Sequence, residues 1–144
     1  MNKGKIISYL SLILIVFVAA VIGYAVFMSV YPFKTIDYMN VPFPILNDNQ
    51  TVKAGDFVRF TVNYCRYTDL PSHVERSLEN NIIYTLLSSD VKNAQGCKTS
   101  ISQVMIPLGV APQKYKLVLT VSWNINIFRT ITKTIETQEF NVVE

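Results

Sequence analysis

The longest hydrophobic stretch of the chain lies near its N-terminal end, where no charged residue occurs between Lys5 and Lys34. An apolar helix needs about 20 residues to cross the hydrocarbon core of a bilayer. The stretch is long enough for this, and we place a transmembrane helix at residues 6–30. We expect residues 1–5 to form a short tail before it and residues 31–37 to form a linker after it.

A cleaved signal peptide is the alternative interpretation of this stretch. The apolar core of a signal peptide is usually about 7 to 15 residues long and ends at small residues. Here the nearest small residues, Ala19 and Ala20, are followed by more apolar residues up to Val30, so cleavage would leave an apolar stub. We therefore expect an uncleaved signal-anchor that contacts membrane lipid through residues 6–30.

The flanking charges predict the orientation of this anchor. Lys3 and Lys5 precede it with no acidic residue nearby, and positively charged flanks stay on the cytoplasmic side. We expect a cytoplasmic N-terminus and a C-terminal domain on the periplasmic or extracellular side. Within the span, Ala19 and Gly23 form a small-x-x-x-small pair that lets a second helix approach closely, although incidental small residues would give the same pattern.

Beyond the anchor, hydrophobic and polar residues alternate with the period of two that is typical of strands with one buried face. The clearest alternating segments are residues 58–64 and 115–124. After a reversal at residues 124–126 comes a third long segment. Three isoleucines in it occupy odd-numbered positions and two later apolar residues occupy even-numbered ones, so the two groups have opposite parity and would face opposite sides of a regular strand. This change predicts a bulge or bend at residues 136–139. The isoleucines are Ile127, Ile131 and Ile135, and the later pair is Phe140 and Val142.

Weaker strand signals occur at residues 36–39, 41–46, 82–87 and 100–108. Prolines interrupt the second and fourth of these segments, and proline lacks the N–H that a strand ladder needs. A polar stretch at residues 72–81 precedes the third of these segments, and we expect a loop at residues 88–96 that is the most mobile part of the domain. Six or seven short strands predict an all-β fold, an antiparallel β-sandwich.

Two stretches resemble parts of immunoglobulin-like or fibronectin type III-like domains. VKAGDFVRFTVNY, at residues 52–64, is similar to their second strand, and YKLVLTVSWNINIFRTITKTIETQEFNVV, at residues 115–143, is similar to their last two strands. The turn Pro112–Tyr115 resembles the one before the tyrosine that opens their penultimate strand, without its usual glycine. The resemblance implies an immunoglobulin-like β-sandwich over residues 38–144.

Cys65 and Cys97 are the two cysteines of the chain. Disulfides persist in exported domains, so we expect these cysteines to pair, with free thiols or metal ligation as the alternatives. Cys65 has the parity of the outward residues Arg59 and Asn63. The bridge is therefore expected at the periphery, where it joins a strand end to the loop at residues 88–98 rather than crossing the core as in antibody domains.

The charge balance gives little sign of a charged partner. From Lys34 to Glu144 the chain has eleven basic and ten acidic residues, and no basic stripe is apparent. Nucleic-acid-binding surfaces need clustered Lys and Arg, so we expect no nucleic acid partner.

Candidate catalytic and metal-binding residues are few. His73 is the single histidine, and a serine triad would have to combine it with Ser72 or Ser77 without a G-x-S-x-G motif. Glu75 and Glu79 are expected to lie on a solvated edge. A soft metal site that combines His73 with Met105, Cys65 and Cys97 lacks the usual ligand spacing.

We therefore expect no catalytic residue, cofactor or metal, and we expect that the chain is not an enzyme. A pocket that grouped His73 with two acids would favour an enzyme instead. Asn49 begins an N-x-T glycosylation sequon, which matters only in a host that glycosylates exported chains.

The sequence thus predicts a single-pass membrane protein that presents its β-sandwich as a protein-interaction or assembly module. The expected partner is a membrane-associated protein, and homo- or hetero-oligomers are both possible. Trp123 has inward parity and is expected in the core, whereas Phe57 and Val118 have outward parity and could form a partner patch. Two alternatives stay open, namely an accessory subunit of a larger membrane complex and an envelope protein encoded by a phage or mobile element.

Overall fold

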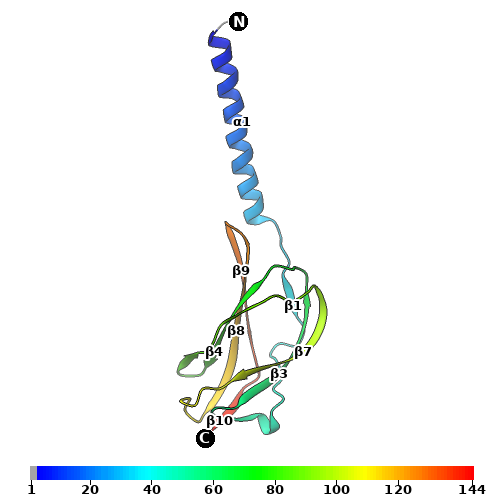
Figure 1. Ribbon diagram of the computed structural model, residues 1–144, viewed down its shortest axis with the longest axis vertical. Coiled ribbons are helices and arrows are strands. Elements are labelled where there is room, and N and C mark those ends of the chain that lie inside the picture. The colour runs from blue at the N-terminus through cyan, green and yellow to red at the C-terminus, as the bar shows by residue number, and fades with distance from the viewer. Residues whose placement is uncertain (1–2) are drawn as a thin grey trace. The chain divides into compact units, whose positions relative to one another are not determined.

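The computed structural model describes residues 3–144, and residues 1 and 2 of the expected tail lie outside the described residues (Figure 1). The chain divides into two compact units. One unit contains the N-terminal helix together with Ile125–Arg129, which we call the hairpin tip. The other contains Lys34–Asn124 and Thr130–Glu144, and we call it the head.

Helix α1 covers Lys3–Val30 and so includes the whole span expected from the sequence. Its segment Tyr9–Val30 is long and apolar enough to cross a membrane, and none of its most apolar window is buried against protein. Ala19 and Gly23 are both exposed, and a Cβ atom added at Gly23 would meet nothing within 4 Å. The side of the helix that carries this pair is therefore open.

The rest of the chain is mostly β-structure, with ten strands and one short 3₁₀ turn (η1) in the described residues. The first strand begins at Ile36, two residues before the expected start of the domain. In chain order the elements are β1 (Ile36–Tyr38), η1 (Asp48–Gln50), β2 (Thr51–Lys53), β3 (Phe57–Arg66), β4 (Ser72–Glu79), β5 (Ile83–Thr85), β6 (Ser89–Val91), β7 (Gly96–Met105), β8 (Lys114–Asn126), β9 (Arg129–Glu136) and β10 (Phe140–Val143).

These strands form two sheets. The smaller sheet has the order β1-β3-β7, and the larger has the order β2-β10-β8-β4-β5, with β6 also paired to β4 and β9 to β8. Where the register of two paired strands is defined, the pairing is antiparallel except for that of β10 with β2, which is parallel. β3 and β7 lie side by side, as do β4 and β8 (Figure 1). The expectation that the head is mostly β-structure is therefore confirmed.

The head has one core to which both sheets contribute. Trp123 of β8 is 1% exposed, as expected from its parity, and Phe60 of β3 is also buried. Phe43 stacks on Phe60 with ring centroids 5.9 Å apart. A cavity of about 140 Å³ lies among residues of both sheets, including Phe60 and Trp123. Large buried aromatic side chains dominate the apolar area of such a core.

A short segment after β1 joins the two sheets. The Phe43 N–H donates to the Glu136 carbonyl at 2.9 Å, and Phe43 forms a bridge with Thr137 beside the larger sheet. Two residues later, Ile45 forms a bridge with Phe60 of the smaller sheet. Pro42 and Pro44 lack the N–H of a continuous ladder, so the segment makes single bridges with each sheet rather than a strand in one of them.

The interruption expected at residues 136–139 is confirmed, because β9 ends at Glu136 and β10 begins at Phe140. Thr137 lies in this interruption and is 2% exposed. Its Oγ1 accepts the Leu117 N–H at 3.1 Å, and its own N–H donates to the Leu117 carbonyl at 3.0 Å. The side chain thus satisfies a buried backbone donor where regular pairing stops.

The polar stretch at residues 72–81 was not among the expected strands, but it forms β4 inside the larger sheet. β4 pairs with β8 over seven residues, from His73 opposite Ser122 to Glu79 opposite Lys116. The inward positions of β4 carry Ser72 and Arg76 as well as buried apolar residues. Polar residues at inward positions hid the alternation that identifies a strand.

Two further expectations need correction. The loop expected at residues 88–96 contains β6, and the strand expected at residues 82–87 is reduced to β5. The reversal expected at residues 124–126 lies instead at Ile127 and Phe128, between β8 and β9. Ile127 is therefore 91% exposed rather than inward. The Asn126 side-chain oxygen accepts the Phe128 N–H at 2.8 Å, a turn-forming contact typical of asparagine.

Candidate functional site: an exposed edge strand and the adjoining cleft

Strand β7 forms one edge of the smaller sheet. All ten of its residues pair with β3, and β7 is the last strand in the order β1-β3-β7. An edge strand leaves a row of backbone N–H and C=O groups available to another extended chain. β7 has one charged residue, Lys98, whereas Ile101 is 70% exposed and Met105 53% exposed. The edge is long and lightly protected by charge.

Both ends of β7 are fixed in the head. At its start, Cys97 pairs directly with Cys65 in the ladder and forms the disulfide expected from the sequence. Just after its end, Ile106 is fully buried and its N–H donates to the Asp56 carbonyl at 2.9 Å. A strand held at both ends keeps its geometry when a second chain approaches, which lowers the entropic cost of binding.

The position of the disulfide partly agrees with the sequence. It joins neighbouring strands of one sheet, so it does not cross the core as in antibody domains. Cys97, however, lies in β7 and not in a loop, and Cys65 is buried although its parity is outward. β7 begins four residues before the strand expected from the sequence. The sequence did not predict this start, because polar residues occupy both faces of the first half of the strand and hide the alternation.

A cleft of about 530 Å³ adjoins the end of β7. Gln103, Met105 and Pro107 line it from the β7 side, and Arg76 and Leu87 are among the residues that line it from the other side. Leu87 is 87% exposed. A concave site of this size with apolar walls and one charged group suits a short extended peptide or a small molecule, and methionine adapts well to different partners.

Arg76 organises the wall of the cleft that faces β7. Its guanidinium donates to the Leu87 carbonyl at 2.9 Å and to the Ser89 hydroxyl at 2.9 Å. The Leu86 N–H donates in turn to the Arg76 carbonyl at 2.8 Å. Burial lowers the pKa of the Arg76 guanidinium, since a charged group loses hydration there. The side chain and the carbonyl of Arg76 thus attach the segment between β5 and β6 to β4.

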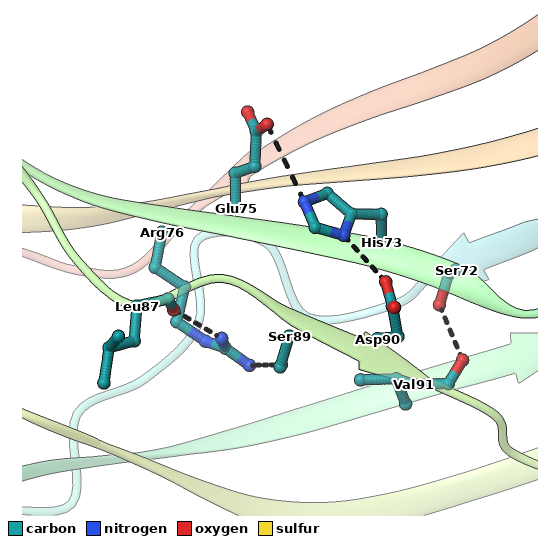
Figure 2. A network of polar contacts seen from close by, with 8 residues as sticks. All are labelled: Ser72, His73, Glu75, Arg76, Leu87, Ser89, Asp90 and Val91. Carbon is teal, nitrogen blue, oxygen red and sulfur yellow. Dashed lines mark hydrogen bonds and ion pairs between the residues drawn. The ribbon is translucent and has the colours of Figure 1, made fainter.

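A polar cluster lies next to Arg76 on the same strands, and Figure 2 shows it. His73 Nδ1 is 2.7 Å from an Asp90 oxygen, and His73 Nε2 is 3.9 Å from a Glu75 oxygen. His73 and Asp90 are opposite each other in the β4–β6 ladder. The Ser72 hydroxyl donates to the Val91 carbonyl at 3.2 Å and so is directed to the backbone of β6.

This cluster groups His73 with two acids, as the enzyme hypothesis required, but on an open surface. The side chains of His73, Glu75 and Asp90 are 45%, 67% and 80% exposed. A carboxylate beside an imidazole can orient the ring and exchange protons with it. Across residues 3–144, however, no hydroxyl or thiol is hydrogen-bonded to this ring, and no group of three metal-binding side chains is found.

Phe57 and Val118 lie in different sheets, Phe57 in the smaller and Val118 in the larger. Phe57 begins β3 and is 44% exposed, whereas Val118 is 8% exposed in β8. Val118 was expected on the outer face, and it is buried because β8 has paired strands on both of its sides. Neighbouring side chains therefore cover a residue that parity places outward. Asn49 of the sequon is exposed in η1.

Sequence reasoning missed the cleft and the role of Arg76. The inward residues Ser100 and Ser102 of β7 are polar and half-buried, so their alternation with outward residues is faint. Arg76 carried no local signal either, because its partners lie eleven and thirteen residues later in the chain. The three-stranded order that makes β7 an edge depends on contacts that are distant in the sequence.

No family model matches the chain, and no curated protein matches it. Among solved structures, one similar chain is an alkylpurine DNA glycosylase, AlkC, from Pseudomonas fluorescens, bound to DNA containing an abasic site analog. The identity is 9% and the TM-score is 0.41. The match covers 76% of this chain, which spans 30% of that neighbour's length.

This neighbour is named as an enzyme, which contradicts the expectation from the sequence that the chain is not an enzyme. We therefore withdraw that expectation. A TM-score of 0.41 does not establish a shared fold, and no substrate or activity is transferred from the neighbour to this chain.

Proposed function

We propose that the chain is a single-pass membrane protein that presents an immunoglobulin-like β-sandwich as a protein-interaction or assembly module. In this proposal α1 crosses the membrane, the N-terminus is cytoplasmic, and the head lies on the periplasmic or extracellular side. The partner is a membrane-associated protein that adds an extended segment to the edge of β7. The exposed ten-residue edge of β7 is the observation that carries the proposal.

Two features support the anchor. Helix α1 exposes its apolar side chains along the whole segment Tyr9–Val30, and such a surface is stable in lipid and unstable in water. The basic residues Lys3 and Lys5 precede the apolar segment, which favours a cytoplasmic N-terminus. The disulfide in the head agrees with an oxidising compartment on the other side of the membrane.

The immunoglobulin-like assignment is supported by one local detail. The Tyr115 hydroxyl donates to the Ala111 carbonyl at 3.0 Å, and Tyr115 lies one residue after the start of β8. Immunoglobulin-like domains have the same bond at their tyrosine corner, from a tyrosine near the start of the penultimate long strand to the backbone a few residues earlier. Two sheets with a shared core agree with this assignment.

Strand addition is the mode of binding that the site favours. Backbone groups of the incoming segment would pair with the open edge of β7, and its side chains would reach outward residues such as Ile101. One end of the same segment would extend into the cleft beside Met105 and Arg76. Main-chain pairing supplies affinity, and the cleft supplies selectivity.

A photo-reactive amino acid at position 101 of the full chain tests this site in native membranes. We expect a cross-link to one specific membrane-associated protein, and a much weaker one when Met105→Lys is added. Met39→Lys is the matched control, because Met39 has 66% exposure and follows β1 at the opposite edge of the same sheet. A cross-link that survives Met105→Lys, or that Met39→Lys removes equally well, would contradict the proposed site.

An accessory subunit of a larger membrane complex is the second candidate function. It is favoured by the open side of α1, where nothing lies within 4 Å of a Cβ built at Gly23, because a helix of another subunit could pack closely there. Co-purification of the same partner should then be lost with Gly23→Leu and retained with Met105→Lys. The interaction-module proposal predicts the reverse.

A further inference from the structure

The hairpin tip between β8 and β9 carries two large apolar side chains in its turn. Ile127 is 91% exposed and Phe128 is 59% exposed. Neither residue has a positive φ angle, so the backbone of this turn does not call for glycine or asparagine. The pair nevertheless leaves two large apolar side chains in contact with water, which is unfavourable unless another apolar surface covers them.

The hairpin tip and the end of α1 belong to one compact unit. The Asn126 side-chain amide donates to the Met28 carbonyl at 3.2 Å, and the Arg129 guanidinium donates to the Tyr31 carbonyl. Carbonyl groups at the end of a helix have no donor within the helix, so the tip supplies donors to them. These bonds hold Ile127 and Phe128 close to the C-terminal end of the apolar helix.

The residues around this helix end have the composition of a membrane–water interface. Phe27 and Tyr31 have ring centroids 5.1 Å apart, and Tyr31 is 50% exposed. Arg129 adds a cationic side chain within the same unit. Aromatic and basic residues gather at the headgroup level, where rings meet the acyl boundary and charges stay hydrated.

We propose that Ile127 and Phe128 insert into the headgroup–acyl boundary of the bilayer that α1 crosses. The occupant of this apolar tip is lipid, and the tip is a second membrane contact far from the helix in the sequence. The inference rests on the proposed function, in which α1 is a transmembrane anchor. An apolar surface inserted in this way is buried about 5 to 10 Å into the interface.

Fluorescent labels of known depth distinguish this proposal from its alternatives. A cysteine replaces Ile127 in the full chain, and mass spectrometry verifies that the Cys65–Cys97 disulfide is intact. The new cysteine is then labelled with an environment-sensitive fluorophore, and the protein is placed in phospholipid nanodiscs. Matched controls carry the label at Leu108, which is 83% exposed in the head, or at Val16 in the middle of α1. Nitroxide lipids quench each label according to its depth.

If the tip enters the interface, the label at position 127 emits at shorter wavelength than the label at position 108, and shallow nitroxide lipids quench it more than deep ones. If the label at position 16 is quenched but the one at position 127 behaves like that at position 108, the tip is not a lipid contact and this inference is wrong, while the anchor stands. If the label at position 16 is not quenched either, the proposed anchor itself is wrong.

Discussion

Reduction of the disulfide should destabilise the head by about 3 to 4 kcal/mol. Cys65 and Cys97 are 32 residues apart in the sequence, and closing a loop of that length lowers the entropy of the unfolded chain by about 12 cal/mol/K, or about 3.7 kcal/mol at room temperature. The folded head loses little, because the two cysteines remain opposite each other in the β3–β7 ladder. The effect therefore acts mainly on the unfolded state.

Urea unfolding of the full chain in detergent measures this difference. Trp123 is the single tryptophan and is 1% exposed, so its fluorescence follows the unfolding of the head. With a urea dependence of the unfolding free energy of about 1.5 kcal/mol per M, a loss of about 3.7 kcal/mol should lower the midpoint by roughly 2.5 M. The urea dependence itself should rise, because an unfolded chain without the cross-link exposes more surface.

The matched control is the double variant Thr61→Ala with Ile101→Ala, which removes another directly paired set of side chains from the same two strands. It should cost only about 1 kcal/mol or less, as exposed cross-strand pairs usually do. The reasoning is refuted if reduction costs no more than this control and leaves the urea dependence unchanged, because the cross-link would then not constrain the unfolded chain.

Three further predictions concern single side chains. Thr137→Val should destabilise the head by about 1 to 3 kcal/mol in the same urea assay, because the buried Leu117 N–H loses its acceptor, whereas Thr137→Ser should stay close to wild type. The hydrogen bond from Lys34 lowers the pKa of Asp37 in the folded head. The ionised Asp37 therefore stabilises the head above the unfolded pKa near 3.9, and this contribution is lost as the pH falls through the lower folded pKa. The difference in unfolding free energy between the wild type and Asp37→Asn should disappear over that acid range. Arg76→Lys should leave the segment between β5 and β6 more open, seen as faster amide hydrogen exchange there with unchanged exchange in β4, because lysine cannot reproduce both guanidinium bonds.

The sequence predicted the parts of the fold that are encoded in local alternation or in long apolar runs. α1 was predicted because 28 charge-free residues leave few alternatives to a helix in lipid. β3 and β8 were predicted because their inward residues are apolar and their outward residues are mostly polar. The interruption before Phe140 followed from a change of parity that a regular strand cannot make.

The remaining elements depend on tertiary contacts. β4 was missed because Ser72 and Arg76 occupy inward positions, where a hydroxyl and a guanidinium are tolerated only through partners on β6 and on the segment before it. The turn at Ile127 was misplaced because its residues are typical of strands. The edge of β7 and its cleft could not be predicted at all, since edge position is a property of the sheet order.

The short segment that bridges both sheets has a mechanical consequence. A force applied to the head through α1 would act along the chain at Ile36 and would first separate the three residues of β1 from β3. It then reaches Phe43, which is tied to the larger sheet, and Ile45, which is tied to the smaller one. After β1 has separated, both layers would therefore resist further extension of this segment.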